Sequence, residues 1–131
     1  MATSYAFEPE NRLCVWKMTG VLDADAIIAT VRTAHSDPLW SNDYDFLTLL
    51  TEARLGQIQP EDSDRIVEAL GALDTPSTDG HAKRGAIVCT DELASALLLY
   101  YEQTSRVSRA SEERIFTDEA EARAWLASPA A

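Results

Sequence analysis

The sequence predicts an α/β fold with elements in the order ββαβαβαβα, forming a mostly parallel, five-stranded mixed sheet with helices packed on it. Three observations lead to this prediction. The chain opens with two apolar runs around a short turn, continues with apolar runs that alternate with amphipathic segments, and closes with a strand that runs directly into a capped helix. A length of 131 residues fits one domain, so we expect residues 1–131 to form a single folded unit.

The strands are predicted from short apolar runs bounded by polar or turn-forming residues. Runs at 4–8 and 12–19 flank Pro9-Glu10-Asn11, which favours an antiparallel hairpin. Both faces of the second run are largely apolar, as expected of an interior strand, and Gly20 is predicted to end it. Three later runs are separated by helical segments, which indicates parallel strands joined by crossovers, at 45–51, 84–90 and 113–116.

Each helix is predicted from an apolar stripe that follows a capping residue or a proline suited to a helix start. The first helix ends before Asp37-Pro38, because proline cannot continue it. In the last helix Asp118 can accept from free amides of the first turn, and Glu121 can reach back to the Asp118 amide as in a capping box. The proposed first or capping residues are Asp23, Pro60, Asp91 and Asp118.

The composition restricts the classes of partner. With 22 acidic and 11 basic side chains the net charge is −11, which opposes binding to nucleic acid or to an anionic membrane surface. No segment is long and apolar enough for a membrane span, and the first residues do not resemble a signal peptide. Cys14 and Cys89 form neither a CxxC nor a zinc-ligand pattern, so we expect free thiols and a cytoplasmic protein.

This order of elements resembles the SpoIIAA-like fold shared by anti-sigma-factor antagonists of the STAS class and by small stand-alone bacterial STAS/SEC14-type proteins. The resemblance extends over nearly the whole chain. It depends on the element order, on the opening hairpin that leads into Thr19-Gly20-Val21-Leu22, and on the closing segment 114–126. It implies a regulatory or protein-interaction module without enzymatic activity. Because lipid-carrier relatives share the broader fold, a carrier or sensor of a small amphipathic or lipid-like ligand is the alternative.

In the antagonists of this class, a kinase partner phosphorylates a serine in an Asp-Ser-rich turn where the third strand meets the second helix. The corresponding segment here, residues 51–63, lacks that pattern. Ser63 stands near Glu61, Asp62 and Asp64, where a phosphate would meet like charges. The phosphorylation switch is therefore not expected to carry over.

Carboxylates follow several predicted strands, at the edge of the sheet where ligands of open α/β folds bind. Asp23, Asp91 and Asp118 are explained as helix caps, which leaves Glu52 as a weak candidate for an acid–base enzyme. His35, at the end of the first helix, is assigned a structural role, and an isolated His81 does not make a metal site. We expect no catalytic residues, no metal and no cofactor.

The surface candidates come from the third predicted helix and the segment after it. Leu99 points away from the buried arc of that helix, and with Tyr100 and Trp40 it could form an interface for a protein partner or for a homodimer. Arg106 and Arg109, together with Arg114, form a basic cluster in an acidic chain. These arginines neutralise nearby carboxylates and the helix end, or they contact an anionic group.

Overall fold

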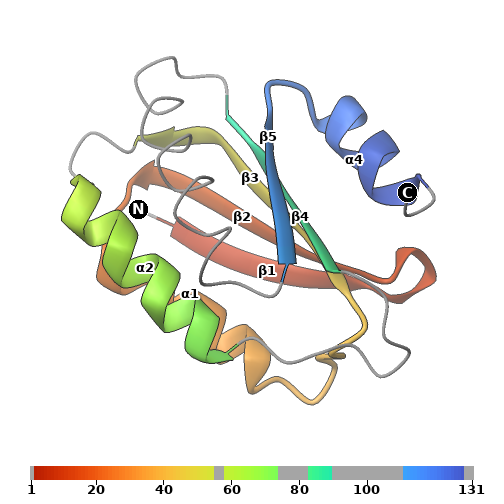
Figure 1. Cartoon of the computed structure of the whole chain (residues 1–131), viewed down its shortest axis with the longest axis horizontal. Coiled ribbons are helices and arrows are strands. Elements are labelled where there is room, and N and C mark those ends of the chain that lie inside the picture. The colour runs from red at the N-terminus through yellow and green to blue at the C-terminus, as the bar shows by residue number, and fades with distance from the viewer. Residues whose placement is uncertain (1, 55–57, 74–82, 90–110, 129–131) are drawn as a thin grey trace.

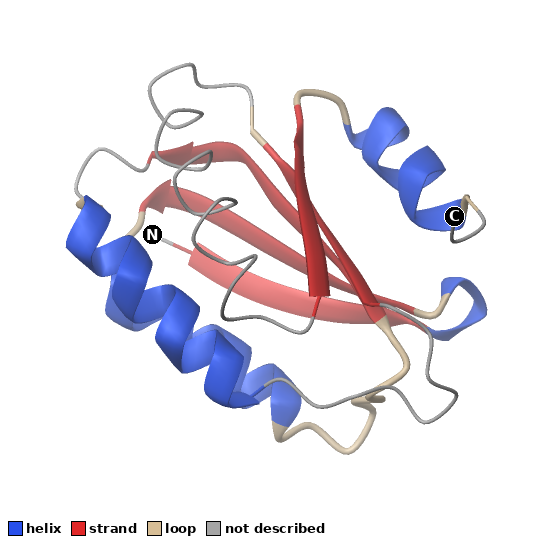
Figure 2. Cartoon of the chain, in the orientation of Figure 1, coloured by secondary structure: helices blue, strands red, loops and turns tan. Residues whose placement is uncertain are grey.

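A computed structural model describes residues 2–54, 58–73, 83–89 and 111–128. A five-stranded sheet has helices α1 and α2 on one face and helix α4 on the other (Figure 1). A one-turn 3-10 helix joins the first two strands (Figure 2). The elements are β1 (Ala2–Glu8), η1 (Pro9–Asn11), β2 (Leu13–Val21), α1 (Ala24–His35), β3 (Asp45–Arg54), α2 (Pro60–Leu73), β4 (Lys83–Val88), β5 (Ser111–Phe116) and α4 (Glu119–Ala127).

The strands stand in the sheet in their order along the chain, β1-β2-β3-β4-β5. β1 is antiparallel to β2, and the other three pairings are parallel. This is the mixed, mostly parallel sheet that the sequence predicts. The predicted third helix, which would join β4 to β5, lies outside the described residues.

The prediction that Gly20 ends the second strand is wrong. β2 continues to Val21 because Gly20 adopts a φ of 77°, a conformation that costs glycine little. Beside it the pairing shifts, since Lys17 pairs with Leu49 whereas Thr19 pairs with Glu52. One extra residue on β3 therefore forms a bulge, and Glu52 lies within β3 instead of following it.

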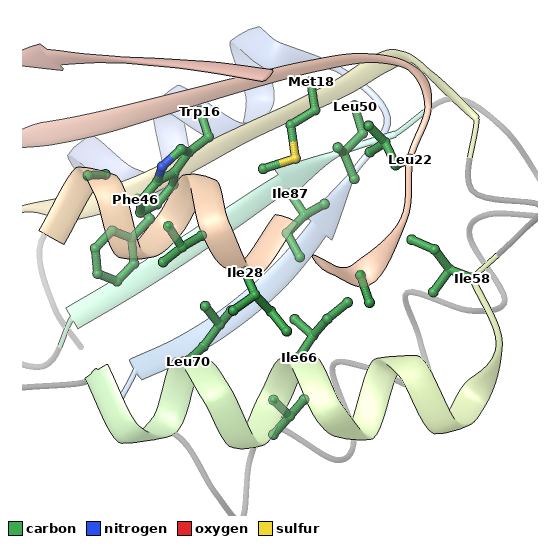
Figure 3. Packing of buried hydrophobic residues seen from close by; sticks show 14 of the residues in the cluster. Trp16, Met18, Leu22, Ile28, Phe46, Leu50, Ile58, Ile66, Leu70 and Ile87 are labelled. Atoms are coloured by element: carbon green, nitrogen blue, oxygen red, sulfur yellow. The ribbon is translucent and has the colours of Figure 1, made fainter. Parts of the chain in front are cut away.

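The larger apolar cluster lies between the sheet and helices α1 and α2. Crossovers of one hand between sequential strands place their helices on the same face, which explains why α1 and α2 share it. Figure 3 shows Ile66 and Leu70 of α2 pointing toward Ile28 of α1 and toward the strands. The buried strand residues of this cluster are Cys14, Trp16, Met18, Phe46, Leu50 and Ile87.

The opposite face of the sheet has a smaller cluster, covered by α4. Ala122 is fully buried there, and Trp125 and Leu126 pack beside it, as their helical spacing predicts. The Asp118 carboxylate accepts from the Ala120 amide at 2.8 Å, so this helix cap is confirmed. The reciprocal bond expected from Glu121 is not among the hydrogen bonds of the described residues.

Candidate functional site

A tight turn after α1 is held between that helix and β1. Asp37 holds it together: its Oδ1 accepts from the Leu39 amide at 2.9 Å, and its backbone carbonyl accepts from the Trp40 amide at 2.9 Å. Its second carboxylate oxygen accepts from the Tyr5 hydroxyl, also at 2.9 Å, which raises the pKa of Tyr5 above its ordinary value. The turn is thus fixed to the first strand as well as to itself.

Trp40, predicted from the sequence as an interface residue, turns its ring inward. The indole stacks on His35 with ring centroids 3.9 Å apart, and it lies nearly parallel to the Phe46 ring at 5.8 Å. Its Nε1 donates to Asn42 at 3.0 Å. The neighbouring Leu39 points outward with 69% of its surface exposed, so the turn presents a leucine next to the stacked rings of Trp40 and His35. Sequence reasoning missed Leu39, because which of the two side chains turns inward depends on the contact of Trp40 with the distant Phe46 ring.

An open groove of about 430 Å³ lies between β1 and α1. The Thr3 and Thr30 hydroxyls are hydrogen-bonded to each other across it at 2.8 Å. Tyr5 belongs to the lining and also bonds to Asp37, so the groove leads to the Asp37–Trp40 turn. All of the lining residues except Ala29 carry a hydroxyl group, and none is charged; the lining residues are Thr3, Ser4, Tyr5, Ala29, Thr30 and Thr33.

Comparison with known proteins identifies a solved structure of similar architecture. No protein-family model matches the chain, and no curated protein matches it. The structure is similar to the crystal structure of an uncharacterized protein from the DUF3478 family of Shewanella loihica PV-4, which has a SpoIIAA-like fold. The similarity covers 95% of this chain and 92% of the other, with a TM-score of 0.56 and 18% sequence identity. The chain has a SpoIIAA-like fold. The fold predicted from the sequence is confirmed.

At the start of α2 in this SpoIIAA-like fold, Ser63 is 2% exposed, and its Oγ has no hydrogen-bond partner. Its hydroxyl is therefore covered in the folded protein. The Asp62 carboxylate accepts from the Gln59 amide at 3.0 Å, which is the return bond of a capping box at the start of α2. Whether the serine switch of the antagonists operates here stays a prediction from the sequence.

Among the other predicted site residues, the structure describes some and omits others. Leu99, Tyr100, Arg106 and Arg109 lie outside the described residues, as do His81 and Asp91. Arg114 lies over the Trp125 ring at 5.0 Å and pairs with Glu112 at 3.5 Å. Arg84, which the sequence did not single out, lies 5.3 Å from the same ring and donates to the carbonyls of Trp125 and Ser128 at the end of α4. Arg84 thereby satisfies carbonyls at the helix C-terminus.

Asp23 and His35 have structural roles at the two ends of α1. Asp23 accepts from the Ala26 amide at 2.8 Å as the cap of α1, and His35 Nδ1 lies 2.9 Å from the Val31 carbonyl. Burial raises the pKa of the Cys14 thiol to about 12, which keeps it from acting as a thiolate nucleophile near neutral pH. Within residues 2–54, 58–73, 83–89 and 111–128, no three His, Cys, Asp or Glu side chains gather to hold a metal ion.

Two charged side chains are buried on the sheet face that α1 and α2 cover. Lys83 is 6% exposed and lies with its Nζ 5.9 Å from the centre of the Phe46 ring, while Glu113 is 8% exposed. Glu113 pairs with Gly85 in the register of β4 and β5, and its carboxylate occupies the space that a Cβ at position 85 would take. The sequence did not indicate these two positions, because Lys83 was expected in a loop and Glu113 at a strand start.

No helix in the described part of the chain has the length and hydropathy of a membrane span.

Proposed function

We propose that this SpoIIAA-like protein is a non-enzymatic regulatory or protein-interaction module, and that the turn from Asp37 to Trp40 belongs to its contact surface. The observation that supports the proposal is the exposed Leu39 on a turn fixed by three hydrogen bonds to Asp37. Covering a leucine side chain contributes on the order of 1.5 kcal/mol or more to association. A turn that is already ordered loses little conformational entropy when a partner binds, so more of that contribution remains as affinity.

Site-specific photo-crosslinking tests this proposal. A photoreactive phenylalanine analogue replaces Leu39 in the full chain, and the matched control carries it at Val21, which is 43% exposed at the far end of β2. In extract of the source organism, or between copies of the chain, we expect a defined covalent adduct from position 39 and little from position 21. The adduct is identified by mass spectrometry.

A Leu39→Ser variant then measures the energy of the contact. We expect the affinity for the captured partner to fall about tenfold, which corresponds to roughly 1.4 kcal/mol. The Val21→Ser variant should bind as the wild type does. Equal crosslinking from both positions, or unchanged affinity in Leu39→Ser, would exclude the turn as a contact surface.

Two unpaired polar atoms support a second candidate function, the binding of a small amphipathic ligand. Trp16 Nε1 and Ser63 Oγ are both buried on the side of the sheet that α1 and α2 cover, and neither has a hydrogen-bond partner. A ligand with an apolar body and a polar group could satisfy one of them. Native mass spectrometry of the purified protein tests this: a co-purifying mass lost in Trp16→Phe supports it, and a spectrum of the bare chain alone contradicts it.

A further inference from the structure

β1 forms one edge of the described sheet (Figure 1). It pairs with β2 through seven consecutive residues, Ala2↔Thr19 to Glu8↔Leu13, without a shift in register. In such an antiparallel strand every second residue directs its amide and carbonyl away from the partner strand. Among the described residues no strand pairs with that outer side.

Edge strands of natural proteins are usually protected against pairing with other chains by lysine, proline, bulges or covering segments. The stretch Ala2–Glu8 contains no lysine and no proline, and its pairing with β2 contains no bulge. Its length of seven residues corresponds to about 23 Å of extended chain. An extended segment of similar length can therefore hydrogen-bond along all of it.

The groove beside this edge gives such a segment a second wall. α1 supplies Ala29, Thr30 and Thr33, so side chains of an added strand that point toward α1 would enter a groove lined by small residues. The Thr30 and Thr33 hydroxyls lie 2.9 Å from the carbonyls of Ala26 and Ala29, which leaves oxygen lone pairs as acceptors for a bound chain. An edge strand with a helix alongside is a known arrangement for recognition of extended peptides.

The net charge of the chain favours some partner segments over others at this edge. The groove has no charged lining residue, and the whole chain carries −11. A second copy would bring another −11 to the same edge, whereas a basic segment is attracted to the acidic chain and a neutral one is not repelled by it. We propose that a neutral or basic extended segment of a partner protein adds to β1 as a sixth strand, with alternate side chains in the groove between β1 and α1. This inference depends on the proposed interaction function and specifies its partner.

A library of linear peptides of about twelve residues, displayed on phage and selected on the full chain, supplies the probe. We expect enriched peptides to be poor in Asp and Glu. Bound peptide should slow hydrogen exchange of the β1 amides about tenfold. Ala29→Gln, which places a larger side chain in the groove from an exposed helix position, should weaken binding at least tenfold.

The matched control is Ala72→Gln, the same change at an exposed position of α2. It should leave peptide affinity unchanged. The inference would be overturned if no peptide were enriched, or if the enriched peptides were acidic. It would also be overturned if the two variants bound peptide equally, or if exchange slowed only in strands other than β1. These outcomes differ from failure of the proposed function, which is read from crosslinking at position 39.

Discussion

Arg123 of α4 donates two parallel hydrogen bonds to the carboxylate of Glu8 at the end of β1, of 3.0 Å from Nη1 and 3.1 Å from Nη2. The two residues are 115 positions apart in the sequence. The same guanidinium donates from Nε to Glu119 one helical turn earlier, at 2.9 Å. The last helix is thus joined to the first strand by a paired contact that geometry makes stronger than a single exposed ion pair.

Loss of this contact should reduce stability in a pH-dependent way. Hydrogen bonds from Arg123, and then from Asn11, lower the pKa of Glu8 from its ordinary value of 4.5. A lowered folded-state pKa gives stability that is complete above the unfolded value and is lost as the pH falls through the folded one. Urea unfolding of Glu8→Gln should therefore show a deficit of about 1 kcal/mol at neutral pH that disappears in acid.

The exposed pair of Arg65 and Asp25 provides the control for this prediction. Its side chains are 52% and 87% exposed, against 36% for Arg123 and 27% for Glu8. Arg65→Ala should cost only a few tenths of a kcal/mol. Two results would contradict a stabilising contact between Arg123 and Glu8. One is an equal loss of unfolding free energy in Arg65→Ala and Arg123→Ala, and the other is a stability deficit of Glu8→Gln that persists in acid.

Gly85→Ala should destabilise the protein by about 1–3 kcal/mol, because the added methyl overpacks a buried position. A Cβ there would lie 2.9 Å from the carboxyl carbon of Glu113, whose side chain is only 8% exposed. Chemical denaturation of four variants in a double-mutant cycle checks the cause. The cost of Gly85→Ala should become small in a Glu113→Ala background, and a cost that stays the same would show that Glu113 is not the obstacle.

Ser63→Ala should raise the free energy of unfolding by about 1 kcal/mol, because it removes a buried hydroxyl that has no partner. Ser41→Ala is the comparison, since the Ser41 hydroxyl accepts from the Asp43 amide at 3.2 Å and its removal should lower stability. Thermal unfolding of both variants measures the contrast. A destabilised Ser63→Ala would mean that the hydroxyl is satisfied in solution.

Both described cysteines should resist thiol reagents in the folded state. Cys14 is fully buried, Cys89 is 1% exposed, and the pKa of about 12 for Cys14 leaves about one thiolate in 10⁴ molecules at pH 8. A colorimetric disulfide reagent should react with neither thiol in buffer and with both in urea. Reaction of Cys14 in buffer at the rate seen in urea would show that this part of the core opens.

The elements that could be predicted from the sequence are those with local causes. Asp23 and Asp118 cap their helices because the capping bond joins residues two or three positions apart. The α4 stripe of Ala122, Trp125 and Leu126 follows from helical periodicity alone. The strand ends were less predictable, since Gly20 continues β2 through a conformation that tertiary pairing selects.

The candidate site was less accessible from the sequence, because it depends on contacts between distant segments. Nothing in the local pattern says that Tyr5 bonds to Asp37, or that Trp40 rather than Leu39 turns inward onto Phe46. The groove likewise exists only once β1 lies beside α1. Local periodicity identifies buried faces, but it does not identify which two faces meet.

The sequential strand order also bears on how the chain acquires its structure. Because every strand pairs with the one before it in sequence, each pairing closes a loop no longer than one crossover, and short closures favour rapid folding. The sheet can therefore grow in the direction of synthesis, from the N-terminal hairpin onward. The contact between Arg123 and Glu8 has to wait for α4, so it can form only after all of the described strands have been synthesised.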